Sequence, residues 1–328
     1  MTEESMIRRR TFITGLGMSV AAPFVARAQD TYRGPVYLIV PFAAGGSTDA
    51  IARIVAEAMR APLGQPVIVE TRAGAGGSVG TAQIARATPD GSIIGMGTAS
   101  TLAINPAAYA KLPYDVMTDL TPIGAIAEVP NVMEINPALP VTDMASFIAY
   151  AKAGPGRITY GSSGNGSVSH LMGEQFRLAT GTDLIHVPYR GVGPALADTV
   201  AGQIMVMFDN LPTSLPLVRD GKLRALAVSS PQRLAILPAV PTFAELNLGE
   251  LDWSAFFGLV APARTPQPVV ERLNAALNDA LAQAPVRDLL SAQQARVTSG
   301  TPAQFSLTMG REIARMQRAT RAANIRIE

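Results

Sequence analysis

Hydrophobic runs and amphipathic patterns alternate along the chain in a regular order. The run at 36–40 predicts a short buried strand, and a glycine-rich turn at 42–49 follows it. The next segment predicts a helix, because its apolar residues recur at helical spacing: Ile51, Ile54, Val55, Ala58 and Met59. Pro62 and Gly64 end that helix. The same order is then repeated by a strand, a helix and a strand at 67–69, 79–87 and 93–97.

A second block of the same kind extends from about 125 to 253. Its predicted strands lie at 157–160, 185–187, 204–208 and 225–228. A helix that begins after a glycine–serine turn ends at Gly181. The hydrophobic run at 256–260 predicts a strand that returns to the first block. Amphipathic helices complete the chain, at 266–283 and 302–323.

Strands that alternate with helices predict a parallel sheet with helices on both faces. We therefore predict an α/β fold of two doubly wound domains, joined by two crossover segments near 120–135 and 250–260. The first domain comprises 29–124 plus 254–328. The second comprises 125–253.

The first 28 residues have the features of an export signal. Arginines at 8–10 precede an uncharged stretch at 14–26. The small residues Ala26 and Ala28 occupy positions −3 and −1 of a cleavage site after Ala28. We predict a signal peptide over 1–28, cleavage after Ala28 and a periplasmic location. The arginine pair followed by x-Phe-Ile favours the twin-arginine route over the general secretory route.

The composition of the chain excludes several classes of function. The 328-residue chain is 48% hydrophobic and 16% charged, as in a globular protein. Its net charge of +2 belongs to the leader, so the rest of the chain is neutral and nucleic acid is not an expected partner. The absence of cysteine excludes a thiol nucleophile and a disulfide scaffold, and two histidines are too few for a histidine-rich metal site. We expect no cofactor and no metal.

The glycine-rich turns provide an anion site that needs no cationic side chain. Glycine lets backbone N–H groups approach a ligand, and a helix start adds about half a positive charge. In a doubly wound fold such turns meet at the carboxyl edge of the sheet. The turns at 45–49 and 162–167 would then face each other across a cleft. The alternative is that their serines only cap helices and their glycines only permit turns.

Enzyme signatures are weak. Gly74, Gly76 and Gly80 have the spacing G-x-G-x-x-x-G, which differs from the dinucleotide fingerprint. A phosphate-binding P-loop is absent, and the Gly-Ser-Ser-Gly run at 161–164 lacks the G-x-S-x-G spacing of a nucleophile elbow. His170 at a helix start and His186 in a strand are interpreted as structural residues, so we predict that the protein is not an enzyme.

Two arginines and the single tryptophan leave alternatives open. Arg72 and Arg190 lie in glycine-rich turns, where each would either clamp a carboxylate or form a structural ion pair. Trp253 lies at the second crossing and is interpreted as part of the core beside a hinge.

Several motifs resemble those of the Bug-type receptors, the periplasmic solute-binding proteins of tripartite tricarboxylate transporters. They are Pro-Phe-Ala-Ala-Gly-Gly-Ser-Thr-Asp at 41–49, Arg-Ala-Gly-Ala-Gly-Gly at 72–77, Tyr-Gly-Ser-Ser-Gly at 160–164 and Pro-Tyr-Arg-Gly-x-Gly-Pro-Ala at 188–195. The resemblance continues at 201–209, 221–228 and 237–242. It implies a clamshell like that of periplasmic binding proteins, which captures a small carboxylate and delivers it to membrane permease subunits. A receptor of this kind is expected to be a monomer.

The resemblance also implies a set of ligand-binding residues. In the first domain these are Phe42, Gly45, Gly46, Ser47, Thr48, Asp49, Thr98, Ala99 and Ser100. In the second domain they are Ser162, Asn165, Gly166, Ser167, Arg190, Gly191 and Asp209. The chain departs from the family at Ala73, where many members have proline, so that loop is expected to be less rigid.

The ligand class extends over dicarboxylates, acidic amino acids and aromatic acids, because backbone donors recognise any carboxylate. One alternative function is an exported serine esterase that uses Ser163 and His170. Another is a receptor that presents its ligand to a signalling partner. The residues do not separate the second alternative from transport, since both use the same cleft.

Overall fold

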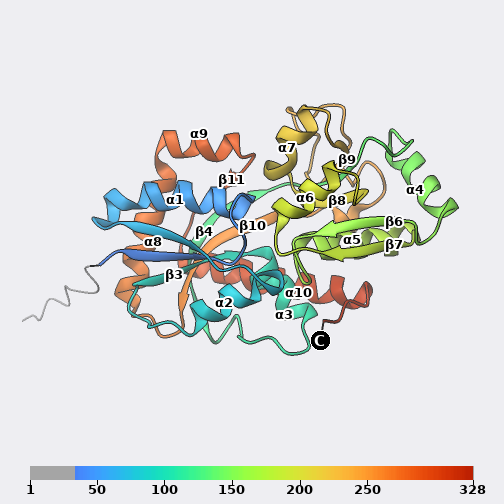
Figure 1. The fold of residues 1–328 in the computed structure, drawn as a ribbon. Coiled ribbons are helices and arrows are strands. Elements are labelled where there is room, and N and C mark those ends of the chain that lie inside the picture. Colours follow the sequence, from blue (N-terminus) through green and yellow to red (C-terminus); the bar gives the residue numbers. More distant parts are fainter. Residues whose placement is uncertain (1–33, 328) are drawn as a thin grey trace, which may run out of the picture. The chain divides into compact units, whose positions relative to one another are not determined.

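The structure, a computed structural model, describes residues 34–327. The predicted signal peptide and its cleavage site lie outside these residues. Two mixed sheets form the frame of the described part (Figure 1). The first has the order β11-β4-β10-β3-β1-β2 and the second the order β7-β6-β8-β5-β9. We refer to each sheet with its helices as the first and the second lobe.

Eight of the eleven strands in the described residues lie close to predicted positions, whereas β4, β5 and β11 were not predicted as strands. In the first sheet they are β1 (Val36–Val40), β2 (Val67–Thr71), β3 (Ile93–Thr98), β4 (Leu120–Val129), β10 (Ala255–Pro262) and β11 (Arg296–Val297). In the second sheet they are β5 (Asn131–Ile135), β6 (Ile158–Ser162), β7 (Leu184–Pro188), β8 (Val206–Asn210) and β9 (Arg224–Val228).

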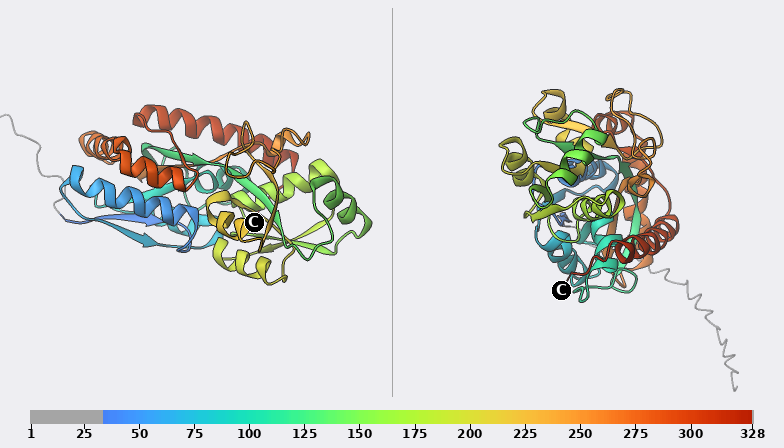
Figure 2. Two further views of the ribbon diagram at one scale, coloured as in Figure 1. Left: turned by 90° about the horizontal axis from the view of Figure 1, so that it is seen from above. Right: turned by 90° about the vertical axis from the view of Figure 1, so that its right-hand side faces the viewer.

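Helices cover both sheets. Those of the first lobe are α1 (Ser47–Leu63), α2 (Ser78–Ala85), α3 (Asn105–Ala108), α8 (Gln267–Ala282), α9 (Ala284–Ala292) and α10 (Pro302–Ala322). Those of the second are α4 (Met144–Ala153), α5 (Val168–Thr180), α6 (Val192–Val200) and α7 (Leu211–Arg219). Short helical turns lie at η1 (Ala75–Gly77), η2 (Ser100–Ile104) and η3 (Gly249–Leu251). Figure 2 shows the two sheets with their helices from two further directions.

Local signals account for the main helix ends. The apolar face of α1 is buried, and Gly64 ends the helix in the left-handed conformation at φ 67°. Gly181 ends α5 in the same way at φ 64°. Ser167 begins α5 as its N-cap, because its side chain accepts a hydrogen bond from the His170 N–H.

The sheets are mixed, whereas the alternation of strands and helices predicts parallel ones. In the first sheet β10 is antiparallel to both β3 and β4, and the short edge strand β11 is antiparallel to β4. In the second sheet β5 is antiparallel to β8 and β9. β5 and β10 enter their sheets directly from the other lobe, so no crossover helix reverses the chain before them.

The chain crosses between the lobes within both predicted crossover segments. β4 leads through Pro130 into β5, and the return path from β9 reaches β10 at Ala255. The predicted domain boundary at 125 falls inside β4, and the change of sheet lies at Pro130. The boundaries at 124/125 and 253/254 stay a prediction.

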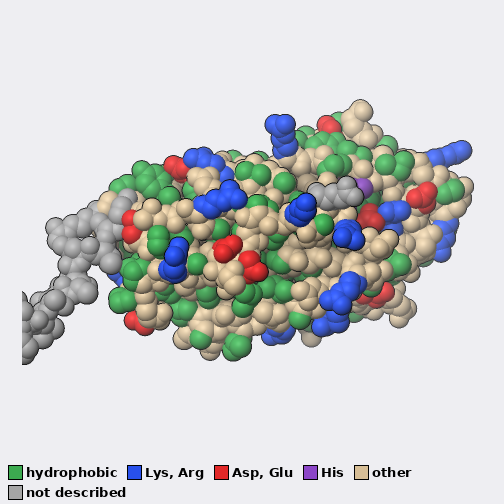
Figure 3. Space-filling view, turned by 90° about the horizontal axis from the view of Figure 1, so that it is seen from below, with side chains coloured by type: hydrophobic (Ala, Val, Ile, Leu, Met, Phe, Trp, Pro, Cys, Tyr) green, Lys and Arg blue, Asp and Glu red, His purple; other side chains and the backbone are tan. Residues whose placement is uncertain are grey.

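Charged side chains are dispersed on the face of the molecule drawn in Figure 3, where basic and acidic groups are interspersed among neutral ones. No helix among residues 34–327 is long and apolar enough to cross a membrane.

Gly258 in the buried strand β10 tests how tightly the first lobe is packed. A Cβ at this position would lie 2.2 Å from the Phe305 ring and 2.8 Å from the Gly124 carbonyl oxygen. We expect Gly258→Ala to lower the free energy of unfolding by about 1–3 kcal/mol, because the overpacked strand cannot shift. Urea unfolding followed by circular dichroism measures the change.

Gly310→Ala is the matched control, since nothing lies within 4 Å of a Cβ there. Gly310 is inside α10, where alanine is a better helix former than glycine. We therefore expect Gly310→Ala to raise the free energy of unfolding by about 0.5–1 kcal/mol. Equal stability of the two variants would contradict the packing described.

Candidate functional site

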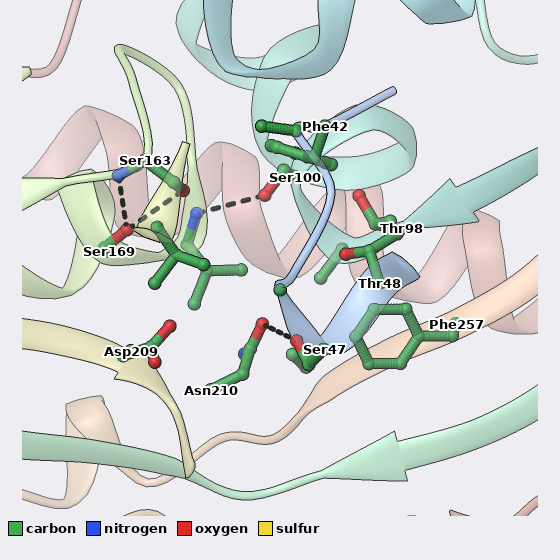
Figure 4. Close-up of a pocket in the computed structure, with 16 residues that line it drawn as sticks. Phe42, Ser47, Thr48, Thr98, Ser100, Ser163, Ser169, Asp209, Asn210 and Phe257 are labelled. Carbon is green, nitrogen blue, oxygen red and sulfur yellow. Dashed lines mark hydrogen bonds between the residues drawn. The ribbon is translucent and has the colours of Figure 1, made fainter. Parts of the chain in front are cut away.

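A cavity lies between the carboxyl edges of the two sheets (Figure 4). The residues that line it are Phe42, Ala43, Gly46, Ser47, Thr48, Thr98, Ala99, Ser100, Ser163, Val168, Ser169, Val192, Asp209, Asn210, Ala255 and Phe257. Its volume is about 40 Å³, which leaves space for about three water molecules. The lobes are therefore closely apposed, and a larger solute enters only when they separate.

The start of α1 forms the first wall of this cavity. Its N-cap is Gly46, which makes no side-chain capping bond, so the first-turn N–H groups receive no cap from the chain before them. Asp49 shapes the preceding turn, because its carboxylate accepts a 3.1 Å hydrogen bond from the Gly45 N–H. Asp49 also forms an ion pair with Arg53 at 3.0 Å. The wall therefore offers N–H and hydroxyl donors, while its one carboxylate is already engaged.

Ser47 joins this wall to the second lobe. Its N–H donates to the Thr213 hydroxyl at 3.1 Å, and its own hydroxyl donates to the Asn210 side-chain oxygen at 3.1 Å (Figure 4). Asn210 in turn donates to the Asn131 side chain at 2.7 Å. The helix start thus contacts the junction of β8 and α7 at the far side of the cleft.

A second wall comes from the loop after β3 and the start of α5. The Ser100 hydroxyl accepts a 3.1 Å hydrogen bond from the Val168 N–H, across the two lobes. Ser169 accepts a 3.1 Å bond from the Ser163 N–H, and both of these serines line the cavity (Figure 4). Ser167, the N-cap of α5, is buried beside this wall and does not line the cavity.

The lobes touch again beside the cavity at a glycine-rich turn. The Tyr109 hydroxyl lies 3.0 Å from the Ala75 carbonyl oxygen of the first lobe and 3.1 Å from the Asn165 carbonyl oxygen of the second. A Cβ on Gly76 would lie 2.0 Å from that same Asn165 oxygen. Only glycine permits this approach, and the single hydroxyl proton of Tyr109 is shared between the lobes.

The structure brings half of the predicted site residues to the cavity wall. They are Phe42, Gly46, Ser47, Thr48, Thr98, Ala99, Ser100 and Asp209. The others do not line it: Gly45, Asp49, Ser162, Asn165, Gly166, Ser167, Arg190 and Gly191. Several of these serve lobe contacts or turns instead; a Cβ on Gly191, for example, would lie 3.0 Å from the Ala43 Cβ. The ligand-binding role of the whole set stays a prediction.

Sequence reasoning missed Asn210, Ser169 and Phe257; Ser163 also lines the cavity and lies in the turn at 162–167 that was expected to face the cleft, but it was not among the predicted ligand-binding residues. Asn210 directly follows Asp209 at the end of β8. Its place next to a predicted site residue was therefore enough to indicate that it lies at the cavity. Phe257 lies on β10, whose antiparallel entry into the sheet brings it to the same edge. The pattern along the chain does not reveal that direction.

The two histidines form a partly buried stack without catalytic geometry. The rings of His170 and His186 are 4.2 Å apart, and His186 Nε2 lies 2.6 Å from the Ser162 hydroxyl. Burial, together with the smaller effects of the charges of His170 and Arg177, lowers the pKa of His186 to about 3. Burial also lowers the pKa of His170, whose Nδ1 accepts from the Gly166 N–H at 3.2 Å.

The esterase alternative required Ser163 and His170 to act together. The Ser163 hydroxyl instead lies 3.2 Å from that of Ser169. Ser162, which does contact a histidine, is completely buried and does not line the cavity. The arrangement thus supplies hydrogen bonds for binding and no accessible nucleophile with a base.

The remaining candidates have structural surroundings. Arg72 pairs with Glu70 at 2.6 Å, and Arg190 is exposed and does not line the cavity. Trp253 is buried and donates to the Gln175 side chain at 3.1 Å. In the described part of the chain, no cationic side chain lines the cavity, and no group of three potential metal ligands occurs.

The chain is similar to several known proteins. Residues 51–325 match the Tripartite tricarboxylate transporter family receptor. The chain is 38% identical over 311 residues to Protein BugT of Bordetella pertussis, covering 94% of each. It is similar in structure to the periplasmic binding protein BugD, with a TM-score of 0.87, 32% identity and coverage of 90% and 100%.

Two further similar structures contain ligands. One is a Rhodopseudomonas palustris protein with adipate, with a TM-score of 0.86, 34% identity and coverage of 90% of this chain and 99% of that one. The other is MatC of Rhodopseudomonas palustris with bound malate, with a TM-score of 0.84, 33% identity and coverage of 88% and 99%.

Tyr109→Phe tests the contact between the lobes. Loss of the hydroxyl that two carbonyl oxygens share should destabilise the closed arrangement of the lobes by about 1 kcal/mol relative to the open one. The ratio of closed to open molecules should then fall up to about fivefold. We expect a larger radius of gyration in solution scattering of the protein without ligand. Tyr150→Phe, at an exposed position in α4, is the control. An unchanged radius in Tyr109→Phe would show that this hydroxyl does not hold the lobes together.

Proposed function

The chain belongs to the tripartite tricarboxylate transporter receptor family, and we propose on that premise that it captures a small carboxylate in the cavity between its lobes. It then delivers this solute to the membrane permease subunits of such a transporter. The family consists of binding proteins, not enzymes, and has the α/β fold of periplasmic binding proteins with two domains and two mixed sheets.

One observation carries the ligand class: the start of α1, whose N-cap Gly46 supplies no side-chain acceptor, faces a cavity whose lining includes no cationic side chain among the described residues. Free N–H groups at a helix start favour an anion, and the hydroxyls of Ser47, Thr48 and Ser100 add donors nearby. The adipate and malate in the similar structures are carboxylates of the size that we propose.

Binding would proceed by movement of the lobes about the two crossings. The crossings at Pro130 and before Ala255 are single strands of backbone, whereas each lobe has its own sheet. Rotation there separates the lobes with little change inside them. A bound carboxylate would contact both walls and so favour the closed arrangement.

The proposed function requires that the protein be exported to the periplasm. The family is periplasmic, and we propose that residues 1–28 direct export by the twin-arginine route, with cleavage after Ala28. We propose further that the mature receptor is a monomer with domains at 29–124 plus 254–328 and at 125–253.

A thermal-shift screen of residues 29–328 against small carboxylates, with matched amides, esters and amines, tests the ligand class. A ligand at 100 times its dissociation constant stabilises the native state by about 2.7 kcal/mol, which raises the melting temperature by several degrees. We expect one or more acids to act and their amides to have no effect. A shift by esters alone would overturn the proposal.

Ser47→Ala combined with Thr48→Ala tests the site. Each lost hydroxyl should cost about 0.5–1.5 kcal/mol of binding, so affinity for the acid found in the screen should fall about tenfold. Calorimetry measures the affinity and circular dichroism checks the fold. Ser291→Ala, at an exposed position of α9, is the control. Unchanged affinity in the double variant would move the site away from α1.

A further inference from the structure

Two carboxyl groups lie next to each other in the wall of the second lobe. Asp209 is on β8 and Glu134 is on the neighbouring antiparallel strand β5. Asp209 pairs with Val132, and Glu134 pairs with Met207. Since side chains alternate along a strand, all four of these residues lie on the same face of the sheet, and Glu134 is a diagonal neighbour of Asp209.

Both groups are shielded from water. Glu134 is completely buried, and Asp209 is 6% exposed where it lines the cavity (Figure 4). Neither oxygen of Glu134 has a hydrogen-bond partner, nor does Oδ2 of Asp209. Such unpaired oxygens in a protein interior are rare, and they point to a function.

The surroundings of the pair are mostly apolar. Val132 packs with Leu211 and Leu215 of α7. Met207 packs with Ala195 and Leu196 of α6. The Ser214 hydroxyl is buried here too, but it makes no hydrogen bond of normal geometry.

Charged residues on the helices and strands that pack around Asp209 and Glu134 do not neutralise these two acids. They are Asp198 on α6, Arg219 on α7 and Arg224 on β9. Across the cleft, Asp49 and Arg53 are paired with each other. None of these charges shifts the pKa of Asp209 or Glu134.

The ionisable residues of α5 lie on the other face of this sheet. Phe208, adjacent to Asp209, points to that face and packs on Phe176 of α5 at 5.7 Å. His170, Glu174 and Arg177 belong to this side, and their charges do not shift the pKa of either acid.

Two carboxylates so close together, without a cation, cannot both be ionised at neutral pH. Burial raises the pKa of Asp209 to about 8, although hydrogen bonds from the Asn210 backbone and the Thr213 hydroxyl lower it in part. Burial raises the pKa of Glu134 well above its ordinary value and the charge of Asp209 raises it further, although the Ser214 hydroxyl lowers it in part. Asp209 borders the cavity, whereas Glu134 is completely buried, so we expect Asp209 to lose its proton first.

We propose that Asp209 presents a protonated carboxyl group to the cavity and donates a hydrogen bond to an oxygen of the bound solute, with Glu134 as the positioning residue behind it. An anionic Asp209 would repel a second carboxylate, whereas a neutral one binds it. The end of the solute at this wall is thus an acceptor: a carboxylate, carbonyl or hydroxyl oxygen, and not an ammonium group. The identity of the solute rests on the proposed function; the proton on Asp209 does not.

The protonation state of Asp209 is measured on the protein without ligand. Carboxyl-carbon NMR shifts of ¹³C-labelled protein, followed from about pH 5 to about pH 9, report each acid separately. We expect one carboxyl signal to titrate near pH 8 and to vanish in Asp209→Asn. In Glu134→Gln that signal should remain, so the two assignments check each other. An ionised Asp209 at pH 6 would overturn the proposal.

The donor role is tested by calorimetry with malate, adipate and aspartate at pH 6 and pH 9. Where an acid binds, wild-type affinity should fall about tenfold over this range as Asp209 loses its proton. Asp209→Asn keeps a donor but cannot titrate, so it should bind within a few fold of wild type at pH 6 and more tightly at pH 9. Asp220→Asn, at an exposed position, should follow wild type.

The outcomes are distinguishable. Failure of every acid to bind would contradict the proposed function, while the NMR titration still decides the state of Asp209. Aspartate binding that strengthens as pH rises and disappears in Asp209→Asn would identify an ammonium site and overturn the donor role. A pH-independent wild-type affinity would overturn it as well. Circular dichroism of both variants confirms that they fold.

Discussion

The buried side chain of Asn131 links both chain crossings to the cavity. Its amide nitrogen donates to the Trp253 carbonyl just before β10, and its side-chain oxygen accepts from Asn210 at the cavity wall, each at 2.7 Å. Its backbone pairs with Ser229, where the chain leaves β9. One completely buried residue thus holds the outgoing strand, the returning strand and the cleft in register. Removing it would leave several buried polar groups unpaired, which is costly in a protein interior.

In the function that we propose, the cavity recognises charge through the backbone. A helix start and several hydroxyls supply donors, while the described lining includes no lysine or arginine. Donors of this kind bind any carboxylate, so they set the chemical class of the solute more than its identity. Discrimination among acids then falls to the opposite wall, where Asp209 and Asn210 lie. The protonation state of a buried acid is a strong filter there, because a proton converts a repelling group into a donor.

Lobe contacts and solute contacts share the same atoms. The Ser47 hydroxyl already donates to Asn210, and the Ser100 hydroxyl already accepts from Val168. A solute that enters must replace some of these bonds or bridge them, so its binding energy is partly offset by the bonds it displaces. The Tyr109 contact lies outside the cavity lining and is free of this competition. Closure and recognition are therefore separable by mutation.

The sequence by itself determined the α/β class, most strands, the ends of α1 and α5, and the turns that border the cavity. These features depend on local signals: apolar periodicity, the left-handed glycines Gly64 and Gly181, and the cap at Ser167. Only the tertiary structure decided the direction of β5 and β10, the contribution of Ser163 and Phe257 to the cavity, and the meeting of Glu134 with Asp209. Glu134 lies in the short segment Asn131–Ile135, and nothing near it in sequence indicates a carboxyl partner 75 positions away. The physical reason is that strand direction and cross-strand neighbours follow from which strands pair, a long-range choice that local periodicity does not encode.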